Sequence, residues 1–360
     1  MPRIADYYNN NEIALYYQNA SSNTIPSLGE TLFPPKKKLG LNLSYIKSGK
    51  GVPQVLKPSS FDVKASIRDR AGFEKIESEM PYFKESFLIK ESDRQEMLKI
   101  LDMSKNDEYL KTVLSNLYDD ATNLIDAAQH QYERMRMQLL CKGKIQVGNE
   151  ESEIGVDFQY GTHFIKAKAD WEDVSTDIIS EIEAIMDLVE TRSGTRPTRA
   201  LCSSKTMSML TKNTGIKNAV LGSKNNTKYV TKKMVQEYFK DEFELSIVAY
   251  SKKFTDEDGN THGMFDDEVF TLLPPNTLGS SWFGTTPEEA DLMGSAAANV
   301  SITDKGIALK TIEQADPVNV QTVVSFLGLP SFENLEQVEI ILTKPGASDL
   351  DNGAEADTLE

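Results

Sequence analysis

The 360-residue sequence is poor in the side chains on which most chemistry depends. It contains two cysteines and three histidines. Cys141 and Cys202 lie far apart, so they form neither a disulfide framework nor a zinc-binding CxxC pair, and two partly buried thiols are the simpler interpretation. The histidines occur singly, outside any HExxH or His-x-His pattern. We therefore expect no metal site and no cofactor.

Motifs for phosphate binding and nucleophilic catalysis are also missing. The sequence has no G-x-S-x-G, no G-x-x-x-x-G-K-[ST] and no G-x-G-x-x-G. Asp256, Asp258 and Asp267 are spaced like ligands of a calcium loop, but Thr261 stands where that loop needs Gly. Strand-like flanks favour an Asp-Gly hairpin turn instead. We predict no catalytic residue and no enzyme; an acid–base hydrolase in the α/β lobe stays open as an alternative because carboxylates are abundant.

No apolar run approaches the roughly 20 residues that cross a bilayer. Met1 is not followed by a basic and then apolar signal segment. These two absences lead us to expect a soluble protein that is made in a cytosol.

The formal charge of −16 is unevenly distributed, with +4 on residues 1–64 and −20 on the remainder. An acidic body is a poor phosphate binder, because neutralising phosphates takes clustered Lys and Arg. Lys36, Lys37 and Lys38 beside two prolines are too few for a nucleic-acid site. A basic arm beside an acidic body suits subunits that meet through opposite charges, although solvated surface charge explains it as well.

Residues 1–54 have the composition of an arm rather than of a domain. They are rich in Asn, Ser, Tyr, Pro and Gly, and only a short helical pattern through Ile13, Leu15 and Tyr17 interrupts them. The arm also holds many apolar and aromatic side chains, which a disordered tail would lack. It must therefore lie against a surface.

Residues 55–91 predict an extended two-stranded loop. Apolar and polar side chains alternate over residues 61–67, and the chain returns over 73–89. The turn between the strands is Arg68, Asp69, Arg70, Ala71 and Gly72. An isolated hairpin is marginally stable in water, so this loop also needs a partner surface.

The clearest helix runs from Ser104 to Cys141. Ser104 and Asp107 match the S-x-x-D capping pattern, and apolar residues follow at spacings of three and four. Such a helix would be about 55 Å long at ~1.5 Å per residue, against a mean helix of about 11–12 residues. It predicts a spine helix.

The rest of the chain predicts a hairpin around residues 148–153, a compact α/β lobe over 163–299, and returning strands over 300–345. Within the lobe, helices are expected around Ile178–Val189, Met207–Leu210 and Met234–Phe239, and strands at Arg199–Ser203, Leu245–Tyr250 and Val269–Leu273. Residues 346–360 contain five acids and no base, so we expect this tail to be disordered.

Several stretches, in order, resemble the phage lambda-type major capsid protein E family. They are residues 27–46 (SLGETLFPPKKKLGLNLSYI), 55–62 (VLKPSSFD), 68–73 (RDRAGF) and 79–85 (EMPYFKE), with 316–319 (DPVN) and 329–332 (LPSF) near the end. The likeness is most specific over residues 27–90 and 312–335.

The resemblance implies an α+β fold of the Hong Kong 97-like type. Its parts would be an N-terminal arm at 1–54, an extended β-hairpin loop at 55–91, and a peripheral domain at 92–162 and 300–345. The peripheral domain would carry the spine helix at about 104–141 beside a β-sheet. An axial α/β domain would occupy 163–299, and the disordered acidic tail 346–360.

The resemblance further implies a major capsid protein of a tailed bacteriophage. Its hexamers and pentamers would close into an icosahedral head shell around packaged double-stranded DNA, held without sequence specificity. Implied partners are further copies of the chain, a scaffolding protein, a portal protein and a decoration protein, with no membrane. The protein would assemble in the host bacterial cytoplasm and end in the virion.

Arm and loop residues are the expected subunit contacts in this interpretation. The candidate interface residues are Leu39, Leu41, Tyr45, Phe61, Arg68, Asp69, Arg70 and Phe73. The alternative function is an encapsulin-like compartment shell protein, which would share the fold but enclose an enzyme cargo instead of a genome.

Overall fold

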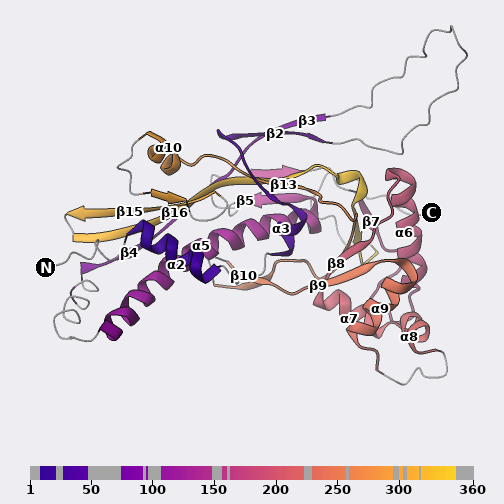
Figure 1. Cartoon of the computed structure of the whole chain (residues 1–360). Helices are drawn as coiled ribbons and strands as arrows, with labels where there is room; N and C mark the ends of the chain where they lie inside the picture. The colour runs from indigo at the N-terminus through magenta and orange to yellow at the C-terminus, as the bar shows by residue number, and fades with distance from the viewer. Residues whose placement is uncertain are drawn as a thin grey trace, which may run out of the picture. The chain divides into compact units, whose positions relative to one another are not determined.

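The computed structural model describes residues 9–21, 27–47, 74–91, 95, 107–147, 156–159, 163–222, 229–256, 259–294, 300–302, 306–315 and 318–345. The chain mixes helices with sheets (Figure 1) and divides into two compact units. Unit 1 comprises Met1–Ser44, Glu77–Glu133 and Ser280–Ser331. Unit 2 comprises Tyr45–Ile76, Arg134–Gly279 and Phe332–Glu360.

Unit 1 is organised around one long strand, β16 (Val318–Phe332). It pairs antiparallel with β15 (Ile307–Ala315) and with β4 (Tyr82–Ile89). The remaining strands of this six-stranded sheet are β13 (Gly279–Phe283), β1 (Pro35–Lys37) and β14 (Val300–Ile302). β16 is rich in Val and Phe and is buried along most of its length, as a central strand requires.

Aromatic side chains fill the space beneath β16. The rings of Phe83 and Phe326 stack at 4.6 Å between centroids, and Tyr132 lies 4.6 Å from Phe283. Gly328 makes this packing fit, because a Cβ there would lie 2.7 Å from the ring of Tyr132. A larger residue at position 328 would therefore have to displace the ring.

The predicted spine helix is present as α5 (Asp107–Lys142), 36 residues long. Ser104, its expected cap, lies outside the described residues. The helix is counted with unit 1 as far as Glu133 and with unit 2 from Arg134. From Tyr132 onward it has no exposed residue before Gly143, including the charged Glu133 and Arg136. The single apolar stripe that the sequence predicted is therefore present only in the turns of α5 before Tyr132.

Unit 2 contains a five-stranded sheet with the order β7, β17, β12, β8, β9. The strands are β7 (Phe164–Lys166), β17 (Glu339–Leu342), β12 (Val269–Leu273), β8 (Arg199–Ser203) and β9 (Ser246–Tyr250). β12 is antiparallel to both of its neighbours, and the outer strands β7 and β9 run parallel to theirs. The predicted strands at 199–203 and 269–273 are confirmed to the residue.

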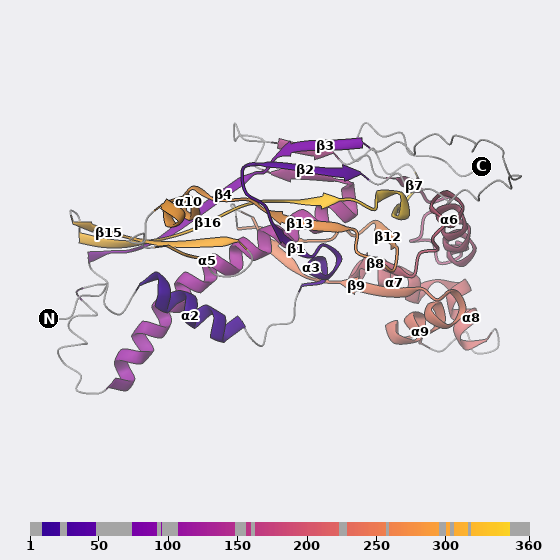
Figure 2. The ribbon, with the colours of Figure 1, turned by 45° about the horizontal axis from the view of Figure 1, so that its top comes forward.

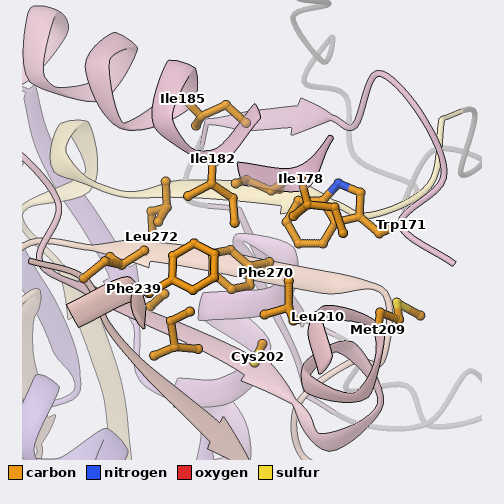
Figure 3. Packing of buried hydrophobic residues seen from close by; sticks show 14 of the residues in the cluster. Trp171, Ile178, Ile182, Ile185, Cys202, Met209, Leu210, Phe239, Phe270 and Leu272 are labelled. Atoms are coloured by element: carbon orange, nitrogen blue, oxygen red, sulfur yellow. The ribbon is translucent and has the colours of Figure 1, made fainter. Parts of the chain in front are cut away.

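Four helices pack with one face of this sheet: α6 (Ile178–Ser193), α7 (Ser204–Lys212), α8 (Thr214–Leu221) and α9 (Lys232–Phe243). Figure 3 shows Ile178 and Ile182 of α6 pointing toward Phe270 of β12. Ser203 caps α7 by accepting from the N–H groups of Lys205 and Thr206. α6 ends at Gly194, whose φ of 71° suits glycine.

The suspected calcium loop is a hairpin, as the sequence analysis favoured. β10 (Lys253–Thr255) pairs antiparallel with β11 (Thr261–Gly263). The carboxylate of Asp256 accepts from the N–H of Asn260 and contacts Nε2 of His262, both at 2.7 Å. This carboxylate therefore stabilises the turn. The second predicted hairpin is also present, as β5 (Lys144–Val147) and β6 (Val156–Gln159).

The extended loop predicted at 55–91 is described only in its returning half. Its returning half is two strands, β3 (Glu74–Glu79) and β4, separated at Met80 and Pro81. β3 pairs with β2 (Asn42–Lys47) of the arm, and β4 belongs to the large sheet of unit 1. The outgoing strand at 61–67 lies outside the described residues, and the predicted domain boundaries stay a prediction.

Candidate subunit interface

The first part of the arm is attached to its own subunit. α2 (Asn10–Ser21) contacts α5, where the Tyr16 hydroxyl donates to Asp119 at 2.8 Å and Gln129 donates to the Tyr17 hydroxyl at 2.7 Å. The rings of Tyr16 and Tyr118 also pack, with centroids 5.2 Å apart. The helix suggested by Ile13, Leu15 and Tyr17 is confirmed, and the tyrosines are the side chains that attach it.

A buried carboxylate holds the next turn of the arm. α3 (Leu28–Leu32) begins beside Glu133 of α5, which accepts from the Ser27 hydroxyl at 2.8 Å and from the Gly29 N–H at 3.0 Å. Backbone N–H groups at a helix start lack partners within the helix, so a carboxylate there is stabilising. Only 3% of Glu133 is exposed.

The three consecutive lysines bind within the chain. Lys37 forms an ion pair with Glu289 at 2.6 Å, Lys36 lies 5.3 Å from the centre of the Trp282 ring, and Lys38 donates to Ser44 at 2.9 Å. Lys36 and Lys37 lie in β1, which pairs parallel with β13. These contacts explain the basic run without nucleic acid.

Glu289 belongs to a group of charges that we call the glutamate cluster: the buried Glu288 and Glu289, and their partners. Both glutamates lie in the first turn of α10 (Pro287–Gly294). Glu288 accepts from the Tyr82 hydroxyl, from Lys84 and from Ser325, at 2.8–3.1 Å. The cluster therefore joins β1, β4 and β16, which are far apart in sequence.

Hydrogen bonds lower the pKa of Glu288 by more than its burial raises it. Burial by itself would raise the pKa of this carboxyl, but donation from Lys84, Ser325 and Tyr82 lowers it from 4.5 to about 2. The same contact raises the pKa of Lys84 above its ordinary value. The Glu288 carboxyl therefore stays ionised well below neutral pH.

Sequence reasoning missed α10, although a signal for it was present. Thr286 and Glu289 form a reciprocal capping box, in which the N–H of Glu289 donates to the Thr286 hydroxyl and the N–H of Thr286 donates to Glu289. Pro287 then occupies the first helical position, where it is favoured. The pairing of these glutamates with residues more than 200 positions away had no sequence signal.

Immediately after the anchored lysines the arm becomes exposed. Leu39 is 72% and Leu41 53% exposed, and they flank Gly40, which has a φ of 96°. β2 follows and pairs with β3, and the two strands lie side by side in both views (Figures 1 and 2). The backbone of Tyr45 lies in β2. We call residues 39–42 the exposed arm segment; the next residue, Leu43, is buried.

The remaining candidate interface residues cannot be placed. Phe61, Arg68, Asp69, Arg70 and Phe73 lie outside the described residues. The structure thus places Leu39, Leu41 and Tyr45 in one stretch of the arm, and the roles of all eight residues stay predictions.

The described residues offer little chemistry beyond packing. Both cysteines are buried, and burial raises the pKa of the Cys202 thiol to about 12 and that of Cys141 well above its ordinary value. No group of three His, Cys, Asp or Glu in the described ranges could hold a metal ion. Among the described helices, none has the length and apolarity needed to cross a membrane.

Several solved structures share this fold. A proposed capsid protein of a prophage of Escherichia coli CFT073 matches with a TM-score of 0.58 at 14% identity, covering 93% of this chain and 99% of that one. A phage-related protein of Bordetella bronchiseptica RB50 gives 0.55 at 12% identity, covering 94% and 99%. The capsid of cyanophage A-1(L) gives 0.52 at 10% identity, covering 90% and 94%. The fold is the Hong Kong 97-like fold of phage capsid subunits.

The sequence identifies the family within that class. The profile of the phage major capsid protein E family matches residues 15–337, so the chain belongs to this family. A comparison with curated proteins gave no match. The resemblance read from residues 27–90 and 312–335 is confirmed, as are the fold class and the capsid function. The family is structural rather than enzymatic, and the compartment-shell alternative has less support.

Proposed function

We propose that this capsid protein forms the hexamers and pentamers of an icosahedral head shell, and that its exposed arm segment bonds neighbouring copies. The proposal that the exposed arm segment bonds neighbouring copies rests on one observation, the difference between the lysine side chains up to Lys38 and the leucine side chains after it. Lys37 and Lys38 are bound to their own subunit, whereas Leu39 and Leu41, one and three positions after Lys38, are mostly exposed.

Burying the two leucines would supply a moderate contact per copy. Full burial of a Leu side chain stabilises by about 1.5–3 kcal/mol. A shell repeats such a contact many times, so weak individual contacts add up to a stable closed particle. The anchored lysines fix where the segment starts, which reduces the conformational entropy lost when it binds.

The remaining partners follow from the proposed role. Phe61, Arg68, Asp69, Arg70 and Phe73 would extend the contact from the loop. The shell would form in the host cytoplasm with a scaffolding protein, a portal protein and a decoration protein, and then take up double-stranded DNA. With a net charge of −16, the subunit would hold this DNA by confinement rather than by phosphate contacts.

The test is shell formation by the double variant Leu39→Ser/Leu41→Ser, co-expressed with the scaffolding protein. We expect the wild type to give megadalton shells by sedimentation and negative-stain microscopy, and the variant to stop at monomers or single capsomers. Leu15→Ser is the matched control, because Leu15 is 54% exposed on the anchored helix α2.

Circular dichroism must show that the double variant retains its fold. Normal shells from a folded double variant would refute the role of the exposed arm segment. Equal loss of shells in the Leu15→Ser control would show that the effect is not specific to this segment.

A further inference from the structure

The backbone of the exposed arm segment is held on both sides, although its two leucine side chains are exposed. Just before the segment, the N–H of Lys38 donates to the carbonyl of Phe283 at 2.8 Å. Within the segment, the carbonyl of Leu41 accepts from the N–H of Met80 at 3.0 Å. All four residues belong to unit 1. The path of the segment is therefore fixed relative to the end of β13 and to the residues that precede β4.

The middle of the segment lies directly against Gly284. A Cβ added to Gly284 would lie 2.8 Å from the carbonyl oxygen of Gly40, and closer still to the side-chain ends of two further residues, Met80 and Leu327. Real Cβ atoms essentially never show contacts below 3.0 Å. The ends of the two side chains can rotate away, but the oxygen of Gly40 is backbone and moves only together with the segment. Glycine at position 284 is therefore what lets the segment lie this close.

Gly284 is itself fixed to the large sheet of unit 1. It is buried, and its N–H donates to the carbonyl of Leu327 in β16 at 2.8 Å. Leu327 is 2% exposed. A buried residue that is hydrogen-bonded to a central strand has little room to move, because the protein interior is close-packed. The exposed arm segment thus crosses a rigid point of the sheet.

Gly40 is required for a different reason. Its φ of 96° lies in the left-handed region, which residues with a Cβ adopt only with strain. In the described part of the chain, no heavy atom beyond its chain neighbours lies within 4 Å of its Cβ position. The requirement therefore comes from the backbone and not from crowding. The bend at Gly40 returns the chain toward the subunit, where Leu43 is completely buried.

The two glycines leave an apolar pair on an ordered backbone. Leu39 and Leu41 are 72% and 53% exposed, yet the backbone that carries them is held at three points. Ordering a backbone costs conformational entropy, and here that cost is met when the subunit folds rather than when a partner binds. The two leucines are therefore preorganised for docking.

We propose that Gly40 and Gly284 are positioning residues, a glycine seat that holds the exposed arm segment in one conformation so that its two leucines dock on a second copy of the chain. The inference rests on the proposed function of this segment. It adds that two residues without side chains set the geometry of the contact, and that the strength of the contact depends on how firmly the segment is held.

Gly40→Ala in the full-length chain tests the glycine seat, because it strains the backbone without filling occupied space. In the unassembled chain, hydrogen exchange at the Met80 N–H should accelerate about tenfold, since the strain displaces the Leu41 carbonyl that accepts from it. With the scaffolding protein present, the protein concentration at which shells form should rise about tenfold, because each copy contributes one such segment. Sedimentation measures this concentration.

Gly284→Ala displaces the same segment from beneath, by crowding rather than by strain. It should accelerate exchange at the Met80 N–H and raise the shell-forming concentration at least as much as Gly40→Ala does. Exchange in β12 of unit 2 should remain slow, which distinguishes displacement of the segment from unfolding of the subunit.

Gly222→Ala is the matched control for Gly40→Ala. Gly222 ends α8 in unit 2 with a φ of 75°, and among the described residues only its chain neighbours lie within 4 Å of its Cβ position. The control variant carries the same kind of backbone strain in a segment that belongs to the other unit. Exchange at Met80 and the shell-forming concentration should therefore match the wild type.

Unchanged exchange at Met80 in both arm variants would overturn the glycine seat. Faster exchange with an unchanged shell-forming concentration would overturn its role in docking, as would an equal loss of shells in Gly222→Ala and Gly40→Ala. Normal shells from Leu39→Ser/Leu41→Ser would instead refute the proposed function. The two failures are distinguishable, because exchange at Met80 is measured without any shell.

Discussion

The core of unit 2 and the glutamate cluster of unit 1 hold strands together in different ways. In unit 2, Ile182, Phe239 and Phe270 are completely buried among apolar neighbours. In unit 1, two buried carboxylates connect three strands through lysine, tyrosine and serine donors. Apolar packing tolerates exchange between similar residues, whereas a buried charge needs each of its partners.

The difference indicates which part of the subunit has a fixed geometry. The cluster determines where β1 and β4 lie on the large sheet, because a shifted strand would leave a buried carboxylate without donors. β1 leads directly into the exposed arm segment. Charged contacts thus fix the starting point of the segment that we propose to bond neighbouring subunits.

The largest effect is expected in the apolar core of unit 2. Phe270→Ala should lower the free energy of unfolding by about 3–5 kcal/mol, because it removes a buried ring and leaves a cavity. Denaturant unfolding of the unassembled chain measures this. Leu188→Ala, at a site 40% exposed, should cost less than about 1 kcal/mol. Similar losses in the two variants would show that the core is not packed as described.

Glu288→Gln should lower the free energy of unfolding at pH 7 by about 2 kcal/mol, because a neutral amide replaces the buried carboxylate that accepts from Tyr82, Lys84 and Ser325. The folded pKa of about 2 lies below the ordinary 4.5, so the carboxylate stabilises the fold above pH 4.5. Its contribution should fall as the pH drops from 4.5 and vanish near pH 2.

Unfolding midpoints of wild type and Glu288→Gln, measured between pH 2 and pH 7, check this dependence. Glu313→Gln is the control, because Glu313 is exposed on β15. A wild-type advantage that stays constant to pH 2 would contradict the assignment of the low pKa to Glu288.

Lys37→Ala should have a smaller effect, about 1 kcal/mol, because Lys37 is 40% exposed and Glu289 retains the N–H of Thr286. The loss should be local. Hydrogen exchange should accelerate at the Lys38 N–H, which donates to the carbonyl of Phe283, and remain slow at β12 in unit 2. Unchanged protection at Lys38 would show that the ion pair does not hold β1.

The smallest effect on stability belongs to the exposed arm segment. Leu39→Ser/Leu41→Ser should change the free energy of unfolding of the unassembled chain by less than about 0.5 kcal/mol, since neither side chain is buried. The same variant should abolish shells, so comparing its denaturation curve with its sedimentation profile separates the two roles. A large loss of stability would assign these leucines to the subunit's own fold.

The lobe of unit 2 could be predicted from sequence because its signals are local. Period-two and period-3.6 patterns locate β8, α6 and β12. β13 was missed: its sequence, GSSWF, lacks alternation because it is buried on both faces. Local patterns also did not predict the parallel pairing between β13 and β1.

The candidate interface was predictable only in part. The exposed leucines followed from an arm with more apolar residues than a disordered segment carries. The attachment of the preceding residues did not follow, because it depends on Glu133, Glu288 and Glu289, which meet the arm and β4 only after folding. The strand at Tyr82–Ile89 was assigned to the loop because alternation indicates a strand but does not identify its neighbour.

Electron cryomicroscopy of particles formed by the full-length chain with its scaffolding protein tests the central claim most directly. We predict closed icosahedral shells of hexamers and pentamers, in which Leu39 and Leu41 are buried against an adjacent subunit while Lys37 remains paired with Glu289 of its own. Particles in which both leucines face solvent, or a chain that stays monomeric at high concentration with the scaffold present, would contradict it.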